Sequence, residues 1–232
     1  MTEIITATGA RPGTVYGRFA DLTIYKALLA REVDLFVRIT EELAEALALE
    51  RIDYVTGDAI EGYNPIHDLC RLVINAAVQL VNRTGQTQVE NFDFSLMRRP
   101  DACPENLRAG AIWFHLDDDA FTRKLTAMRA YPELADEVRA GLDGDRLELL
   151  RTYEALFEEL EPLLRDLGTE AYRVECLRPA RREGVDDFSL TGRIPFYERY
   201  GEKLAAAGRY QSVIRYEEHL RPVAEALGRI SR

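Results

Sequence analysis

Residues 52–68 read IDYVTGDAIEGYNPIHD, and a run of apolar residues at helical spacing, 69–81, follows at once. α/β enzymes present reactive groups at the carboxyl end of a strand through this order: a short apolar segment, a loop rich in acidic and amide side chains, then a helix. No other stretch of the sequence combines these features. It predicts an α/β protein with a candidate site in this loop.

The loop carries its own signals for the start of a helix. Asn64 is a favoured N-cap residue, and Pro65, with a fixed φ and no backbone N–H, suits the first helical turn. His67 then falls in that turn, away from the apolar stripe. Gly85 is placed to cap the end of this helix. The residues of the stripe, which would pack on a sheet, are Leu69, Leu72, Val73, Ala76 and Leu80.

Acidic side chains precede the histidine in the same loop. Asp58, Glu61 and His67 could converge where the strand ends and bind a hard or borderline cation. Asp68 lies in the first helical turn, where the helix dipole favours negative charge. A partly exposed histidine at a helix start, without a ligand, accounts for the same residues equally well.

Residues 54–58 (YVTGD) together with 61–67 (EGYNPIH) resemble the second metal motif of the LmbE-like, or GlcNAc-phosphatidylinositol de-N-acetylase-like, deacetylases. The resemblance implies a Rossmann-like three-layer fold of the α/β class and zinc bound by His67. Asn64 stands where the family often has a second histidine that polarises the substrate carbonyl. Asn can donate a hydrogen bond to an oxyanion but cannot deliver a proton.

Residues 1–51 contain no histidine, so the N-terminal His-Pro-Asp-Asp-type motif of that family is not found there. In the family this motif supplies the other two zinc ligands and the aspartate base. Either the sequence starts downstream of the motif or it belongs to a branch that lost it, and the first strand–helix units of the fold would be missing with it.

The activity that the resemblance implies is hydrolysis of an N-acetylated amino sugar or small glycoside by a metal-activated water. An acid near the metal would act as the base, and Asp58 is the candidate. Glu61 and Tyr63 of the loop are candidate contacts for the small-molecule substrate. Arg178, in an arginine cluster that follows a predicted strand, is a candidate contact for an anionic substrate group, although such clusters more often balance nearby acids.

A second stretch invites comparison with the missing motif. Residues 115–118 (HLDD) end a predicted strand and precede a predicted helix over 120–130. A permuted metal site with His115 is conceivable there. We favour the alternative in which the aspartates cap the helix.

The remaining pattern predicts a helix-rich single LmbE-like domain over 1–232, with a C-terminal helical tail over 195–232. Helices are expected around 24–29 and 33–47 and over most of 133–168. Strands are expected at 3–8, 53–56, within 86–97, at 111–116 and at 172–177. His219, in the tail, is expected to pack or cap rather than bind metal.

Composition limits the partners. The net charge of −10 gives no general attraction to nucleic acid or to anionic membranes. Three widely spaced cysteines indicate neither a disulfide framework nor a thiolate zinc site, and the sequence has no signal peptide or membrane-length apolar run. These features predict a cytoplasmic protein, as in bacterial LmbE-like relatives, and are compatible with a homo-oligomer.

Three functional hypotheses follow from the sequence. The first is a zinc-dependent N-deacetylase or related amidase with an incomplete ligand set. The second is a non-catalytic LmbE-like relative that binds a ligand or a partner through the same loop. The third is a helix-rich interaction protein without a site.

Overall fold

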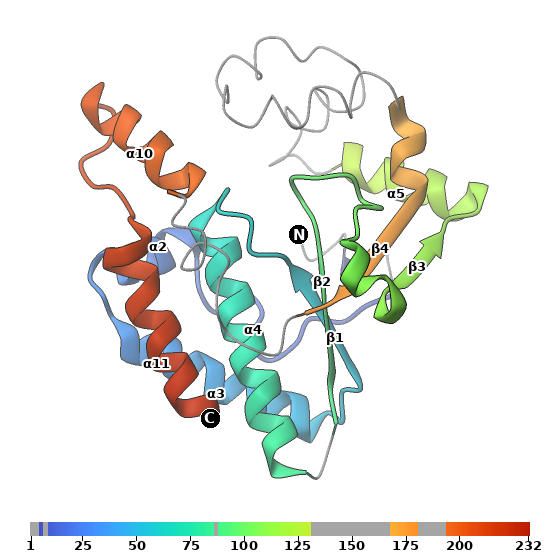
Figure 1. Cartoon of the computed structure of the whole chain (residues 1–232), viewed down its shortest axis with the longest axis horizontal. Helices are drawn as coiled ribbons and strands as arrows, with labels where there is room; N and C mark the ends of the chain where they lie inside the picture. Colours follow the sequence, from blue (N-terminus) through green and yellow to red (C-terminus); the bar gives the residue numbers. More distant parts are fainter. Residues whose placement is uncertain (1–4, 7–8, 86–87, 131–167, 181–193) are drawn as a thin grey trace. The chain divides into compact units, whose positions relative to one another are not determined.

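The computed structural model of the chain describes residues 5–6, 9–85, 88–130, 168–180 and 194–232 (Figure 1). The chain divides into two compact units. The first unit comprises Met1–Gly13 and Ser95–Arg178, and the second comprises Thr14–Phe94 and Pro179–Arg232. The candidate loop lies in the second unit.

Parallel strands joined by a helix form the centre of the second unit. Strand β1 (Tyr54–Asp58) leads through helix α4 (Pro65–Thr84) to strand β2 (Glu90–Phe94), and the strands pair in parallel from Tyr54↔Glu90 to Asp58↔Phe94. Parallel strands need a crossover connection, which α4 provides. The predicted strand–loop–helix order is therefore confirmed, with β1 displaced from the expected 53–56.

Helix α4 begins and ends at the predicted residues. The side chain of Asn64, in extended backbone conformation, accepts the N–H of Ile66, and Pro65 occupies the first turn. At the other end Gly85 adopts a φ of 70° and its N–H reaches the carbonyl of Asn82. These caps place His67 in the first helical turn, as expected.

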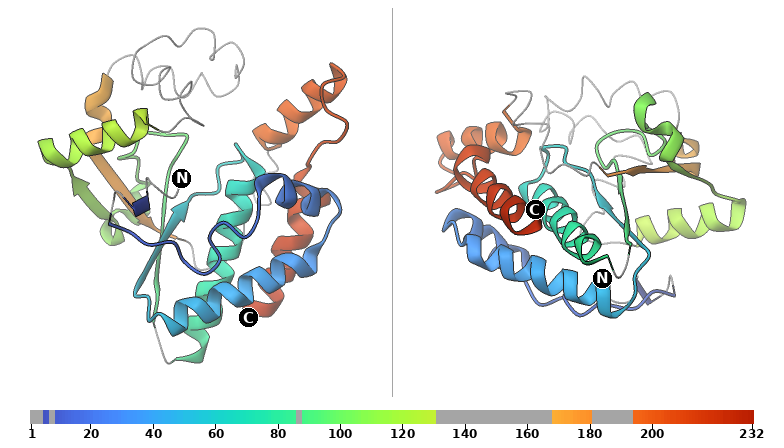
Figure 2. Two further views of the ribbon diagram at one scale, coloured as in Figure 1. Left: turned by 180° about the vertical axis from the view of Figure 1, so that it is seen from behind. Right: turned by 60° about the horizontal axis from the view of Figure 1, so that its bottom comes forward.

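Further helices cover α4. Helices α2 (Asp21–Leu29), α3 (Val33–Leu49) and α11 (Arg221–Ser231) belong to the same unit, and α3, α4 and α11 lie side by side in Figures 1 and 2. The largest fully buried apolar side chains of their shared core are Leu28, Phe36, Leu220, Val223 and Leu227. A second apolar cluster joins α3 and α4 to the start of β2 through Leu47, Ala77, Val78, Val81 and Val89.

The tail reaches this core through three elements. Helix α10 (Phe196–Ala206) is followed by a non-helical stretch, a π-helical turn (Tyr216–Leu220) and α11. Val213 and Ile214 are buried, although they precede the helix that they were expected to join. His219 is also buried, and its Nδ1 accepts the N–H of Arg215 at 2.9 Å. The expectation that it packs is confirmed.

The first unit contains an antiparallel strand pair. Strand β3 (Ile112–His115) pairs with β4 (Val174–Pro179), from Ile112↔Leu177 to His115↔Val174. Among its described residues are the 3₁₀ turns η1 (Glu105–Gly110) and η3 (Gly168–Arg173) and helix α5 (Asp118–Arg129). Asp117 caps α5 by accepting the N–H of Ala120 at 2.8 Å. The capping interpretation of 115–118 is confirmed.

These observations establish a mixed, helix-rich α/β chain. The Rossmann-like deacetylase fold and the single domain over 1–232 stay predictions. The strand expected at 3–8 is wrong at Ile5 and Thr6, which are helical, and most of the helix expected at 133–168 falls outside the described ranges. In the described part of the chain no helix is both long and apolar enough to cross a membrane.

Candidate functional site

The first turn of α4 folds the candidate loop back onto itself. The carboxylate of Asp68, which is buried, accepts the N–H of Glu61 at 3.0 Å and that of Gly62 at 3.1 Å. Gly62 has a φ of 68°, a conformation that glycine adopts without strain. A helix-start carboxylate thus satisfies two loop amides, which fixes the loop between β1 and α4.

Burial changes the acidity of this carboxyl group. Loss of solvation disfavours the charged form and raises the pKa of Asp68 to about 7. The two loop N–H groups oppose that shift because they stabilise the carboxylate. Burial therefore makes Asp68 a weaker acid than an exposed aspartate, whereas the sequence predicted only a favourable charge at the helix start.

His67 and Asp58 form the reactive contact of the loop. Nδ1 of His67 faces Oδ2 of Asp58, the last residue of β1, and the two side chains are 41% and 24% exposed. The hydrogen bond to Asp58 raises the pKa of His67, with smaller contributions from the charges of Asp58, Asp68 and Asp21, while burial opposes the shift. Because a carboxylate can only accept, Nδ1 carries the proton and Nε2 is the group available for chemistry.

Asn64 holds the start of α4 through its side-chain oxygen. Its Oδ1 accepts the N–H of Ile66 at 2.8 Å and lies 3.4 Å from the hydroxyl of Tyr25 on α2. The oxygen is thereby engaged in capping, so the NH₂ group is the part of Asn64 that can donate to a substrate oxygen. Burial raises the pKa of Tyr25, which keeps this hydroxyl protonated as a donor.

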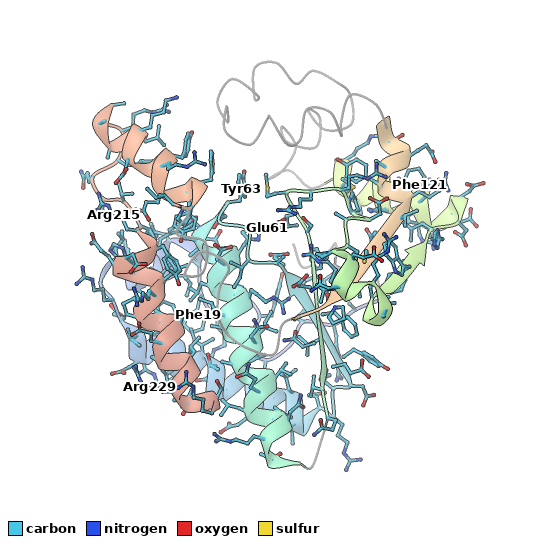
Figure 3. The ribbon with its side chains drawn as sticks, in the orientation of Figure 1. Phe19, Glu61, Tyr63, Phe121, Arg215 and Arg229 are labelled. Atoms are coloured by element: carbon cyan, nitrogen blue, oxygen red, sulfur yellow. The ribbon has the colours of Figure 1, made fainter. Side chains whose placement is uncertain are left out.

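The loop is also held by α10. The N–H of Tyr197 donates to the carbonyl of Gly62 at 3.1 Å. Next to this contact the ring of Tyr63 stacks on Phe196, with centroids 5.8 Å apart, and Phe196 stacks on Tyr200 at 5.4 Å. Figure 3 shows Glu61 and Tyr63 on the segment that leads into α4. The structure thus brings the side chains of Asp58 and His67 into contact, at the end of β1 and the start of α4. The site roles of Glu61, Tyr63 and Asn64 stay predictions.

Sequence reasoning missed several neighbours of the loop. Tyr25 and Asp21 lie one turn apart on α2, and no sequence signal said that α2 would face the start of α4. Arg71 follows His67 by one turn and shares a helix face with Asp68 and Asn75, which are also buried. Polar residues at this spacing within an apolar helix were a readable signal of a buried polar role. Arg178 is buried on β4, in the first unit, so its predicted contact with substrate stays a prediction.

The described residues do not assemble a zinc centre. Catalytic zinc sites use three protein ligands, and among the described residues no three His, Cys, Asp or Glu side chains are grouped to hold a metal. His67 and Asp58 are two donors, and they already contact each other. His115 is exposed on β3 and His219 is engaged with Arg215. The zinc site that the resemblance implies therefore stays a prediction.

Comparisons of the chain with protein-family models, with curated proteins and with solved structures gave no match. The deacetylase resemblance therefore stays a prediction, and function must be argued from the loop itself.

Proposed function

We propose that the chain is a hydrolase of a small polar substrate that carries an amide, similar in reaction to the N-deacetylases, and that the loop 58–68 is its active site. One observation supports the proposal above the others. A histidine in the first turn of α4 meets a carboxylate at the carboxyl end of a parallel strand, with one ring nitrogen held and the other available.

In the proposed reaction Nε2 of His67 takes a proton from water, and the resulting hydroxide adds to the amide carbonyl carbon. The NH₂ group of Asn64 donates to the oxyanion, the role that the sequence suggested for it. The proton on Nε2 then passes to the amide nitrogen as the C–N bond breaks, which releases a carboxylic acid and an amine, and the acid then gives its proton to the amine. Asp58 holds the Nδ1–H tautomer throughout. No step of this proposal is routed through a metal.

A non-catalytic relative that binds a ligand through the same loop is the second candidate. The observation that favours it is the incomplete donor set, since a family member without its metal ligands could keep the binding loop and lose the chemistry. Both candidates place the small molecule against Tyr63 and Asn64.

Release of acetate and amine from a panel of N-acetylated amino sugars tests the proposal. The wild type, His67→Ala and the matched control His115→Ala would be compared, each after chelation and again with added zinc. The proposal expects turnover by the wild type and His115→Ala in both conditions, and none by His67→Ala. If substrate binds but neither the wild type nor either variant turns it over, the result supports the second candidate. Turnover that needs zinc and His67 would require metal ligands from outside the described residues.

A further inference from the structure

A buried arginine lies directly behind the Asp58–His67 contact. Arg71 is 2% exposed and is the largest fully buried side chain of the described residues. Its Nε donates to the backbone carbonyl of Asp58 at 2.7 Å, and Nη2 donates to the carbonyl of Phe92 at 3.0 Å. Nη1 donates to Asn91 at 2.9 Å and to Asn75 at 3.3 Å. One guanidinium thus joins the end of β1 and the middle of β2 to the second turn of α4.

We propose that Arg71 is a positioning residue of the site, which fixes the end of β1 so that the Asp58 carboxylate meets the imidazole of His67. The proposal rests on the proposed function, because it assigns Arg71 a part in that same contact. Arg71 touches no reacting atom in this account. It acts through the backbone of Asp58. His67 and Arg71 lie one turn apart on α4, so the same helix carries the imidazole and holds the strand end that carries the carboxylate.

The geometry requires a guanidinium rather than any cation. Its N–H groups lie in one plane and point in fixed directions, so it can bind two strands and a helix at once. The ammonium group of lysine is a compact point charge that offers three donors on a flexible stem and cannot reproduce the fork. The amide of Asn91 also donates to Asn75 at 2.8 Å, so the acceptors of Arg71 are themselves held in place.

Gly57 shows how closely the guanidinium fits the strand. A Cβ atom at this position would lie 2.8 Å from Nη2 of Arg71 and 2.9 Å from Cδ1 of Ile74. Gly57 directly precedes Asp58, and its missing side chain is the space that the guanidinium fills. A methyl group there would displace Arg71 without removing its charge, so Gly57→Ala is an independent way to disturb the same contact.

Nitrogen NMR of His67 tests the proposal without any assay of activity. At about pH 9 the ¹⁵N shifts of Nδ1 and Nε2 report which nitrogen of the neutral ring carries the proton. Asp58→Ala defines the shifts of a ring without its carboxylate. We expect the wild type to show Nδ1–H, and Arg71→Lys and Gly57→Ala to move toward the Asp58→Ala shifts. Val78→Ala, a core truncation in the same helix, controls for lost stability and should retain the wild-type shifts.

Folding of each variant is checked by far-ultraviolet circular dichroism, and Gly57→Ala carries the test if Arg71→Lys does not fold. A folded variant of either kind that keeps the wild-type shifts overturns the proposal. Its failure is distinguishable from failure of the hydrolase proposal. Arg71-dependent ¹⁵N shifts in a protein without amidase activity would support the positioning role and contradict the hydrolase proposal. Amidase activity with ¹⁵N shifts that do not depend on Arg71 would support the hydrolase proposal and contradict the positioning role.

Discussion

The imidazole of His67 meets the carboxylate of Asp58 although the two residues belong to different elements, a helix start and a strand end. Nine positions separate them in the sequence, and the loop between them is held from both sides. Asp68 binds its amides and α10 binds the carbonyl of Gly62. The contact is thus a product of how the loop is fixed, and each fixing interaction can be removed by itself.

Replacement of Asp58 by Asn should lower the proposed amidase activity by roughly 10²- to 10⁴-fold, the range of a general acid–base contribution. An amide that turns its NH₂ toward Nδ1 would favour the opposite tautomer and leave Nε2 protonated. Initial rates of amine release, measured beside Asp119→Asn as an exposed control, check this. A rate equal to that of the wild type would show that His67 does not need its carboxylate.

The acidity of Asp68 makes stability depend on pH in a defined direction. The folded-state pKa of about 7 lies above the ordinary value of 3.8, so the folded chain holds this proton more tightly than the unfolded chain. The resulting stabilisation is complete below the unfolded-state pKa and is lost as pH rises through the folded-state pKa. Asp68→Asn removes this dependence.

Urea unfolding of wild type and Asp68→Asn at about pH 5 and pH 8 measures the pH dependence of stability that Asp68 contributes. Between these pH values the wild type should lose stability relative to Asp68→Asn, by roughly 3 kcal/mol of unfolding free energy at most. An unchanged difference at the two pH values would mean that Asp68 titrates alike in both states.

Replacement of two glycines of the second unit by alanine should change the free energy of unfolding in opposite directions. Gly85 caps α4 with a φ of 70°, so Gly85→Ala should cost about 1 kcal/mol. Gly228 lies within α11 with open space at its Cβ position, so Gly228→Ala should stabilise by about 0.5–1 kcal/mol. Thermal unfolding of both variants checks the pair, and equal signs would contradict the assigned backbone conformations.

The packing of helix α10 on Val213 should be destabilised when a methyl group is added at Gly201. A Cβ at Gly201 would lie 2.8 Å from Cγ1 of Val213, so Gly201→Ala should destabilise by about 1–3 kcal/mol through overpacking. Because α10 also binds the loop at Gly62, amine release should fall with it. The double variant Gly201→Ala/Val213→Ala should recover part of the stability. Additive losses in this cycle would show that the two residues do not press on each other.

The sequence predicted the elements that local chemistry decides. Asn64, Pro65 and Gly85 carry cap and backbone preferences that hold in almost any context, so the bounds of α4 followed from them. Burial of Leu69, Leu72, Val73 and Ala76 followed from helical spacing. The grouping of Asp58 with His67 also followed, because a loop of this length must bring the end of a strand near the start of its helix.

Contacts between elements distant in the sequence could not be read in this way. Tyr25 reaches Asn64, and Tyr197 reaches Gly62, only because α2 and α10 pack at the start of α4, and helical periodicity gives a face without naming its partner. The π-helical turn at 216–220 was likewise not foreseen, since Val213 and Ile214 extend the apolar pattern into a segment that is not helical. The pKa of Asp68 depended on burial, which a helix-dipole argument does not supply.

Titration of the His67 ring by NMR tests the central claim most directly. In the wild type its C2 proton should titrate above the ordinary histidine value of about 6.5, because Asp58 stabilises the imidazolium. Stability from this pair should then be present below that value and be lost as pH rises through the folded-state pKa. Asp58→Asn should lower the midpoint of His67. A His67 midpoint that is the same in both proteins would contradict the account.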